Sequence, residues 1–148
     1  MKVFLYAIVP LTVAATALWW QSPPVPVREE RIVIGGVMHR LLVADEPREH
    51  RRGLGNRDTL DADTVMLFTF PENGRHGIWM KDMRFAIDIV WLDDQNRIVH
   101  IEKEIAPETY PEVFTPEHDT RYVIEMHAGR ASELLLEVGQ QLEAWPSG

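Results

Sequence analysis

Residues 31–43, RIVIGGVMHRLLV, contain two apolar runs that are separated by Gly35 and Gly36. Paired glycines adopt the positive φ angles of a tight hairpin turn at little steric cost, so this stretch predicts two antiparallel strands. Pro47 follows shortly afterwards and predicts the first turn of a short helix over 46–52. The domain is therefore expected to begin with a β-hairpin and a short helix.

The rest of the chain alternates short apolar segments with turn residues. Segment 85–92 has apolar residues at odd and even positions, which predicts a strand covered on both faces. Segment 106–120 contains three prolines, and we expect a long loop there. The pattern predicts a mainly β fold, a single small β-sandwich or partly closed barrel with two short helices. The expected strands are 64–70, 78–84 paired with 85–92, 97–105 and 121–126, and the expected second helix is 130–138, which would bury Ala131, Leu134, Leu135 and Val138.

An apolar segment precedes the domain. Residues 3–20 form an uncharged run of 18 residues, at the short limit of a membrane span of about 20 residues. Residues 15–17, ATA, have the spacing that a signal peptidase reads, whereas Trp19 and Trp20 would anchor an uncleaved helix at the outer interface of the membrane. Either outcome predicts an exported domain, periplasmic or otherwise extracytoplasmic, and an uncleaved leader would tether it to the inner membrane.

The chain is therefore divided into three parts. Residues 1–20 are the signal peptide or membrane anchor, residues 21–30 are a proline-rich spacer, and residues 31–148 are the β-rich globular domain. A total of 148 residues fits one domain with such an appendage.

Composition excludes several classes of function. The chain has no cysteine, which excludes thiol nucleophiles, zinc–thiolate sites, iron–sulfur clusters and disulfides. A net charge of -8 disfavours nucleic acids and anionic lipid surfaces, so contact with a membrane is expected through the N-terminal segment only. No motif of a nucleotide, metal or cofactor site occurs, and we predict no catalytic residue, metal or cofactor. A composite metal site from His118, His127 and Glu125 or Asp119 is the alternative.

A few polar residues stand within apolar strands and form the candidate ligand-binding site. Asp88 and Glu125 each interrupt an apolar run, and a buried carboxylate needs a cation or several donors. Lys81 or Arg84 is the expected partner of Asp88, and Glu125 needs a partner for the same reason. Both carboxylates near Lys81 would form an acid and base pair, although a purely structural ion-pair cluster would have the same pattern. Trp79 and Tyr110 would stack on a sugar or another flat ligand, or else pack in the core.

Several motifs occur in an order that resembles the widespread prokaryotic family of domain of unknown function 192, over about residues 31–145. This resemblance implies a small β-sandwich that is commonly exported and has no established biochemical activity. Gly55 and Asp82 depart from the family pattern, which usually has methionine and asparagine there. The matching segments are Gly53-Leu54 with Arg57 and Leu60, 66–70 MLFTF, 79–83 WMKDM, 87–89 IDI, 122–125 YVIE and Ala128-Gly129, and the motif positions are Trp79, Met80, Lys81, Asp88, Glu125 and Gly129.

Three functions are compatible with these residues. The favoured one is a non-catalytic binding or accessory module of the cell envelope, whose partner is an unknown small molecule, a glycan or an envelope protein. The face with Trp79, Lys81 and the 106–120 loop would bind it. The second is a hydrolase with Asp88 and Glu125 as a carboxylate pair about 5 to 9.5 Å apart. The third is a membrane-tethered scaffold for another envelope protein.

Overall fold

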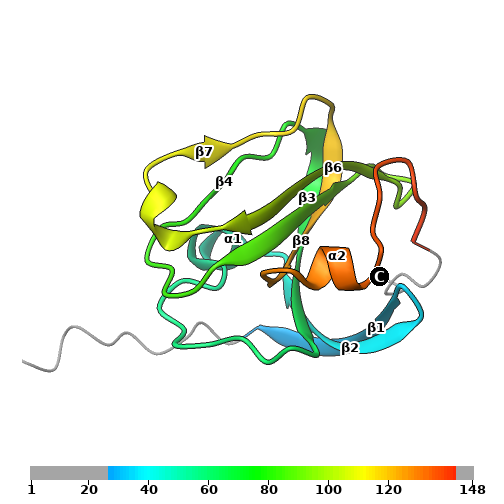
Figure 1. Cartoon of the computed structure of the whole chain (residues 1–148). Helices are drawn as coiled ribbons and strands as arrows, with labels where there is room; N and C mark the ends of the chain where they lie inside the picture. Colours follow the sequence, from blue (N-terminus) through cyan, green and yellow to red (C-terminus); the bar gives the residue numbers. More distant parts are fainter. Residues whose placement is uncertain (1–26, 143–148) are drawn as a thin grey trace, which may run out of the picture.

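The structure, a computed structural model, describes residues 27–142 (Figure 1). The predicted leader and residues 21–26 of the predicted spacer lie outside the described residues and stay predictions. Residues 28–30, which were expected to end the spacer, instead begin the first strand of the domain. Within residues 27–142, none of the helices is long and apolar enough to cross a membrane.

The fold is mainly β with two short helices, as predicted. Its main sheet has six strands, and β1 and β6 stand at the two ends of the strand order, so the sheet remains open. A second, two-stranded sheet pairs β4 with β7, and Figure 1 shows these two strands side by side. In the order of the main sheet the strands are β1 (Arg28–Ile34), β2 (Val37–Ala44), β3 (Thr64–Gly74), β8 (Thr120–His127), β5 (Ile87–Leu92) and β6 (Ile98–Ile105), and the small sheet consists of β4 (Ile78–Trp79) and β7 (Val113–Phe114).

The predicted hairpin is confirmed. Ile34 pairs with Val37, and the two turn glycines between them have φ angles of 58° and 78°. The helix α1 (Pro47–Arg52) is also confirmed, and a capping box between Glu46 and Glu49 begins it. The next pair, β2 and β3, is parallel, so residues 45–63 form a crossover that carries α1. This crossover brings the turn after α1 onto one face of the main sheet.

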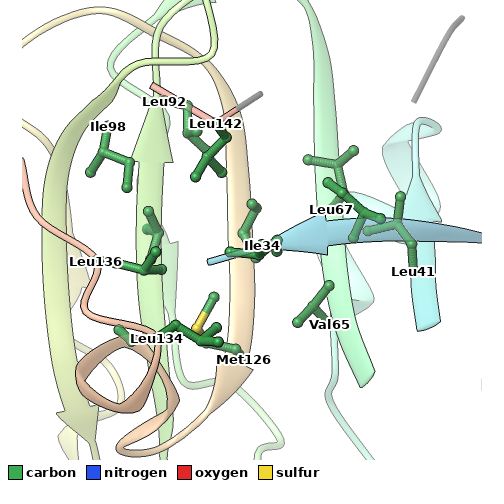
Figure 2. Packing of buried hydrophobic residues seen from close by; sticks show 14 of the residues in the cluster. Ile34, Leu41, Val65, Leu67, Leu92, Ile98, Met126, Leu134, Leu136 and Leu142 are labelled. Atoms are coloured by element: carbon green, nitrogen blue, oxygen red, sulfur yellow. The ribbon is translucent and has the colours of Figure 1, made fainter. Parts of the chain in front are cut away.

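Both faces of the main sheet are covered, as predicted for 85–92, and all six residues of β5 are buried. Alternation along β8 assigns Ile124 and Met126 to one core and Val123 to the other. The first core also contains side chains from the short helix α2 (Arg130–Glu133) and the segment after it (Figure 2). The second core contains Leu54, from the turn after α1. Its other members include Leu60, Met66, Phe68, Ile78, Met80 and Ile89.

The prediction that 78–84 pairs with 85–92 is wrong. Trp79 pairs with Val113, inside the segment expected to be a loop, while 85–92 contains β5, which pairs with β6 and β8. Asp82 has a φ of 58°, and this turn ends the extended backbone soon after Trp79. Because β4 pairs with β7, the 106–120 segment lies beside Trp79 and helps to form the site described below.

The prediction for the C-terminal helix is partly wrong. Ala131 and Leu134 are buried as expected, but Leu135 and Val138 are 80% and 64% exposed. The helix has four residues, and Leu135 then adopts a left-handed φ of 53°. This reversal ends the helical periodicity, so Leu136 enters the core in place of Leu135.

Candidate functional site

Glu125 is a buried acid in the middle of β8. It lies between Met66 of β3 and Ile89 of β5, and only 4% of its surface is exposed. Its Oε2 atom has no hydrogen-bond partner within residues 27–142. Desolvation raises the pKa of Glu125 to about 8, although a hydrogen bond from the Leu54 backbone acts in the opposite direction. At neutral pH the side chain is therefore a carboxylic acid with unused hydrogen-bonding capacity.

The turn that follows α1 passes over this acid. Gly53 ends α1 with a φ of 48°, which favours glycine. A Cβ atom at Gly53 would lie 3.2 Å from Cζ of Phe68 and 3.5 Å from Oε2 of Glu125. The absent side chain thus lets the backbone approach the carboxyl group, and the next residue, Leu54, donates to it.

A small cleft opens beside this turn. Glu125 and Phe68 belong to its floor, α1 contributes His50 and the two arginines that follow it, and Trp79 and Lys81 contribute from the β4 side. The cleft has a volume of about 40 Å³. A cavity of about 10 to 15 Å³ holds one water molecule and one of about 150 Å³ holds benzene, so the recess accepts small groups such as a hydroxyl or a water and excludes a ring.

Exposed aromatic side chains stand at the cleft. Trp79 is 42% exposed, and its neighbour Tyr110 is 45% exposed, so neither belongs to the core. Their rings form an edge-to-face pair with centroids 6.0 Å apart and an interplanar angle of 64°. Nζ of Lys81 lies 5.5 Å from the centroid of the Trp79 ring, within the range of a cation–π contact. Two aromatic rings and one cation are therefore presented to solvent next to the recess.

Asp88 lies elsewhere. It pairs with Met126 across β5 and β8, whereas Glu125 pairs with Ile89, so the two carboxyl groups point to opposite faces of the main sheet. Asp88 is fully buried and accepts three backbone N–H groups: those of Glu104 and Ala131 at 2.8 Å and that of Gly129 at 3.1 Å. Those donors, and neither Lys81 nor Arg84, satisfy it. The predicted convergence of Lys81, Asp88 and Glu125 is wrong, and a carboxylate pair for hydrolysis is not formed.

With this geometry in place, comparison with known proteins gives the family. The family model described as an uncharacterised ACR, DUF192 (domain of unknown function 192), matches residues 31–144. The chain belongs to the DUF192 family. No curated protein matches it.

Two solved structures share the fold of this DUF192 chain. One is described as a candidate transcription regulator from Sinorhizobium meliloti 1021, with 24% identity and a TM-score of 0.74 over 81% of this chain and 96% of that one. The other is a protein of unknown function from Novosphingobium aromaticivorans DSM 12444, with 20% identity and a TM-score of 0.69 over 79% and 84% of the two chains. At these identities the likeness concerns the fold alone.

The motif positions on which the family resemblance rests separate into two groups in the structure. Trp79, Lys81 and Glu125 line the cleft, and Tyr110 contacts Trp79 from outside the motif. Asp88 belongs to the opposite face, where it binds the backbone of the segment before and within α2. One part of the motif therefore forms the candidate site, and another part holds the fold.

The composite metal site suggested by the histidines is not formed. Within residues 27–142 there is no group of three or more histidine, aspartate or glutamate side chains that would hold a metal ion. His127 is exposed, and its Nδ1 atom contacts the carbonyl oxygen of Ala128.

Sequence reasoning missed the part of the cleft that α1 supplies. His50 donates through Nε2 to the carbonyl of Ala44 at 3.0 Å, and its ring contacts Phe70 with a centroid distance of 4.6 Å. From the sequence, Gly53 indicates only the end of the helix expected over 46–52. The available signal was the position of Gly53-Leu54 in the family motif beside Trp79 and Glu125, although nothing in the sequence states that the turn lies on β8.

Proposed function

We propose that this DUF192 chain is an exported, non-catalytic binding module of the cell envelope that holds a small molecule or glycan in the cleft above Glu125. The observation that carries the proposal is the buried carboxyl group of Glu125, whose Oε2 atom has no partner among residues 27–142. Trp79 and Lys81 line the same cleft, and Tyr110 contacts Trp79. Convergence of a few polar groups with aromatic side chains in a concave site is typical of ligand binding.

The contrast between the two buried acids supports a functional reading of Glu125. Asp88 has three backbone donors, as expected of a structural carboxylate. Among the described residues Glu125 has the Leu54 backbone donor and an Oε2 atom without a partner, and an under-satisfied buried polar group destabilises the fold. Such a cost is common where a side chain serves a ligand instead of the fold. Glu125 is also the sole acidic residue of the cleft lining within the described chain, which favours binding over acid–base hydrolysis with two carboxyl groups.

The binding function is tested by removing the aromatic platform. A panel of sugars, sugar acids, amino acids and cell-wall fragments is screened for compounds that raise the melting temperature of the full-length chain, because a ligand of the native state stabilises it by mass action. We expect Trp79→Ala to abolish the shift while the melting temperature without ligand changes by about 2 °C or less, since Trp79 is half-exposed. Val138→Ala, a truncation at an exposed apolar residue outside the cleft lining, is the control. A shift of equal size in Trp79→Ala would contradict the proposed site.

Export is proposed from the uncharged run 3–20 and the proline-rich residues 21–30. Fusion of residues 1–30 to alkaline phosphatase, which is active only outside the cytoplasm, is expected to give active reporter, and the same fusion without residues 3–20 to give none. The mass of the exported protein then distinguishes a cleaved signal peptide from a retained anchor. An inactive reporter on the complete 1–30 fusion would refute export.

A further inference from the structure

The charge of the cleft is opposite to that of the protein. Arg51, Arg52 and Lys81 line it, against the single acid Glu125, although the chain has a net charge of -8. None of these three basic residues forms a salt bridge with any residue in 27–142. Because Glu125 is uncharged at neutral pH, it does not offset them. A locally positive recess on an acidic protein attracts and selects an anionic group.

The volume of the recess limits what reaches Glu125. A recess of about 40 Å³ accepts hydroxyl-sized groups and excludes a ring, so most of the ligand must lie outside, against Trp79 and Tyr110. A protonated carboxyl group has one O–H donor and an acceptor oxygen, and an alcohol has the same complement. A hydroxyl group is thus the best match to the floor.

The aromatic mouth is suited to a saturated ring that bears hydroxyl groups. The face of an aromatic ring is electrostatically negative, and it attracts C–H bonds whose hydrogens are partly positive, as on the apolar face of a pyranose. The rings of Trp79 and Tyr110, at 64° to each other, form a corner for such a ring. Lys81, whose Nζ atom lies over the Trp79 ring, adds a cation to the same mouth.

Together these features point to an acidic sugar. We infer, building on the proposed binding function, that the cleft recognises a hexuronate unit of a glycan. Its ring lies on Trp79, its carboxylate faces Lys81, and one hydroxyl enters the recess above Glu125. Arg51 and Arg52 contribute to the positive potential of the α1 side of the cleft.

Titration calorimetry on the full-length chain, in a detergent without a sugar headgroup, tests this inference. The probes are trimers of galacturonate and of glucuronate, their methyl esters, which lack only the charge, and cyclohexanecarboxylate, which lacks the hydroxyl groups. At least one hexuronate trimer is expected to bind about tenfold more tightly than its methyl ester. Lys81→Ala is expected to reduce this preference to threefold or less, whereas Lys103→Ala, at an exposed lysine on β6, leaves it unchanged.

The role of the floor is tested separately. Glu125→Gln keeps a donor and an acceptor and is expected to change affinity by threefold or less. Glu125→Met has a similar volume without them and is expected to weaken binding about tenfold. Equal loss in both variants, with the fold intact by circular dichroism, would contradict a hydrogen bond between the floor and the ligand.

The outcomes separate this inference from the proposed function. Equal binding of acid and methyl ester refutes recognition of the charge, and equal binding of cyclohexanecarboxylate refutes recognition of a sugar. If both trimers fail to bind but another compound from the panel is lost in Trp79→Ala, the hexuronate inference is wrong and the binding function stands. If every ligand of the chain still binds Trp79→Ala, both are wrong.

Discussion

Asp88→Ala is expected to lower the free energy of unfolding by about 3 to 5 kcal/mol. The substitution removes the acceptor of three backbone N–H groups, those of Glu104, Gly129 and Ala131, at a fully buried position. Each buried donor left without a partner costs about 1 to 3 kcal/mol, and the three donors belong to β6 and to the segment that begins α2. Urea unfolding followed by circular dichroism measures the loss.

The same experiment separates a structural role from a role in binding. Asp119→Ala, at an exposed aspartate, is the matched control and should change stability by about 0.5 kcal/mol or less. Because Asp88 and Glu125 are on opposite faces of the sheet, the folded fraction of Asp88→Ala should bind ligand as wild type does. A stable Asp88→Ala protein with impaired binding would show that Asp88 contributes to ligand binding, and would contradict its assignment as a structural residue.

The fold class was predictable because its signals are local. The Gly35-Gly36 turn requires positive φ angles that few other residues adopt, and the apolar residues at odd and even positions of 85–92 indicate coverage on both faces without reference to strand order. Helix α2 shows the limit of such signals. The apolar spacing over 131–138 is helical, but α2 ends at Glu133 and Leu135 takes a left-handed conformation, an outcome that the spacing does not indicate.

The candidate site was only partly predictable, because strand register decides which buried acids meet. The sequence predicts Trp79, Lys81, Tyr110 and Glu125 as site residues. Of these, Trp79, Lys81 and Glu125 line one cleft. Sequence reasoning placed Asp88 with them, since any buried carboxylate needs partners. A shift of one residue in the pairing of β5 with β8 would exchange the faces, and this register is not encoded in either strand alone.

The contribution of α1 depends on topology in the same way. Parallel pairing of β2 with β3 requires a crossover, and that crossover delivers Gly53 and Leu54 to Glu125 from 70 or more positions away in the sequence. A hairpin between the two strands, equally compatible with their apolar patterns, would have left the acid uncovered.

Coverage of Glu125 by this turn has a measurable consequence for stability against pH. The pKa of Glu125 is raised from the usual 4.5 to about 8 in the folded state, chiefly by desolvation. Between these values the unfolded chain releases the proton while the folded chain retains it, so the unfolded state binds fewer protons and stability falls as pH rises. The stabilisation that results from the raised pKa of Glu125 is fully present below about pH 4.5 and is lost by about pH 8. The expected slope in this window is about -1.4 kcal/mol per pH unit.

Glu125→Gln removes the titrating group, and we expect it to remove this slope. Relative to wild type, its free energy of unfolding should increase by about 3 kcal/mol between pH 5.5 and pH 8, measured by urea unfolding across that range. His50 and Lys81, which line the same cleft, are present in both proteins and largely cancel in the difference. Glu117→Gln, at an exposed glutamate, controls for the loss of one acid. Its free energy of unfolding should change with pH as that of the wild type does. A Glu125→Gln curve that also runs parallel to that of the wild type would mean that Glu125 is ionised in the folded protein, in which case the floor of the cleft is an anion and no longer suits an acidic ligand.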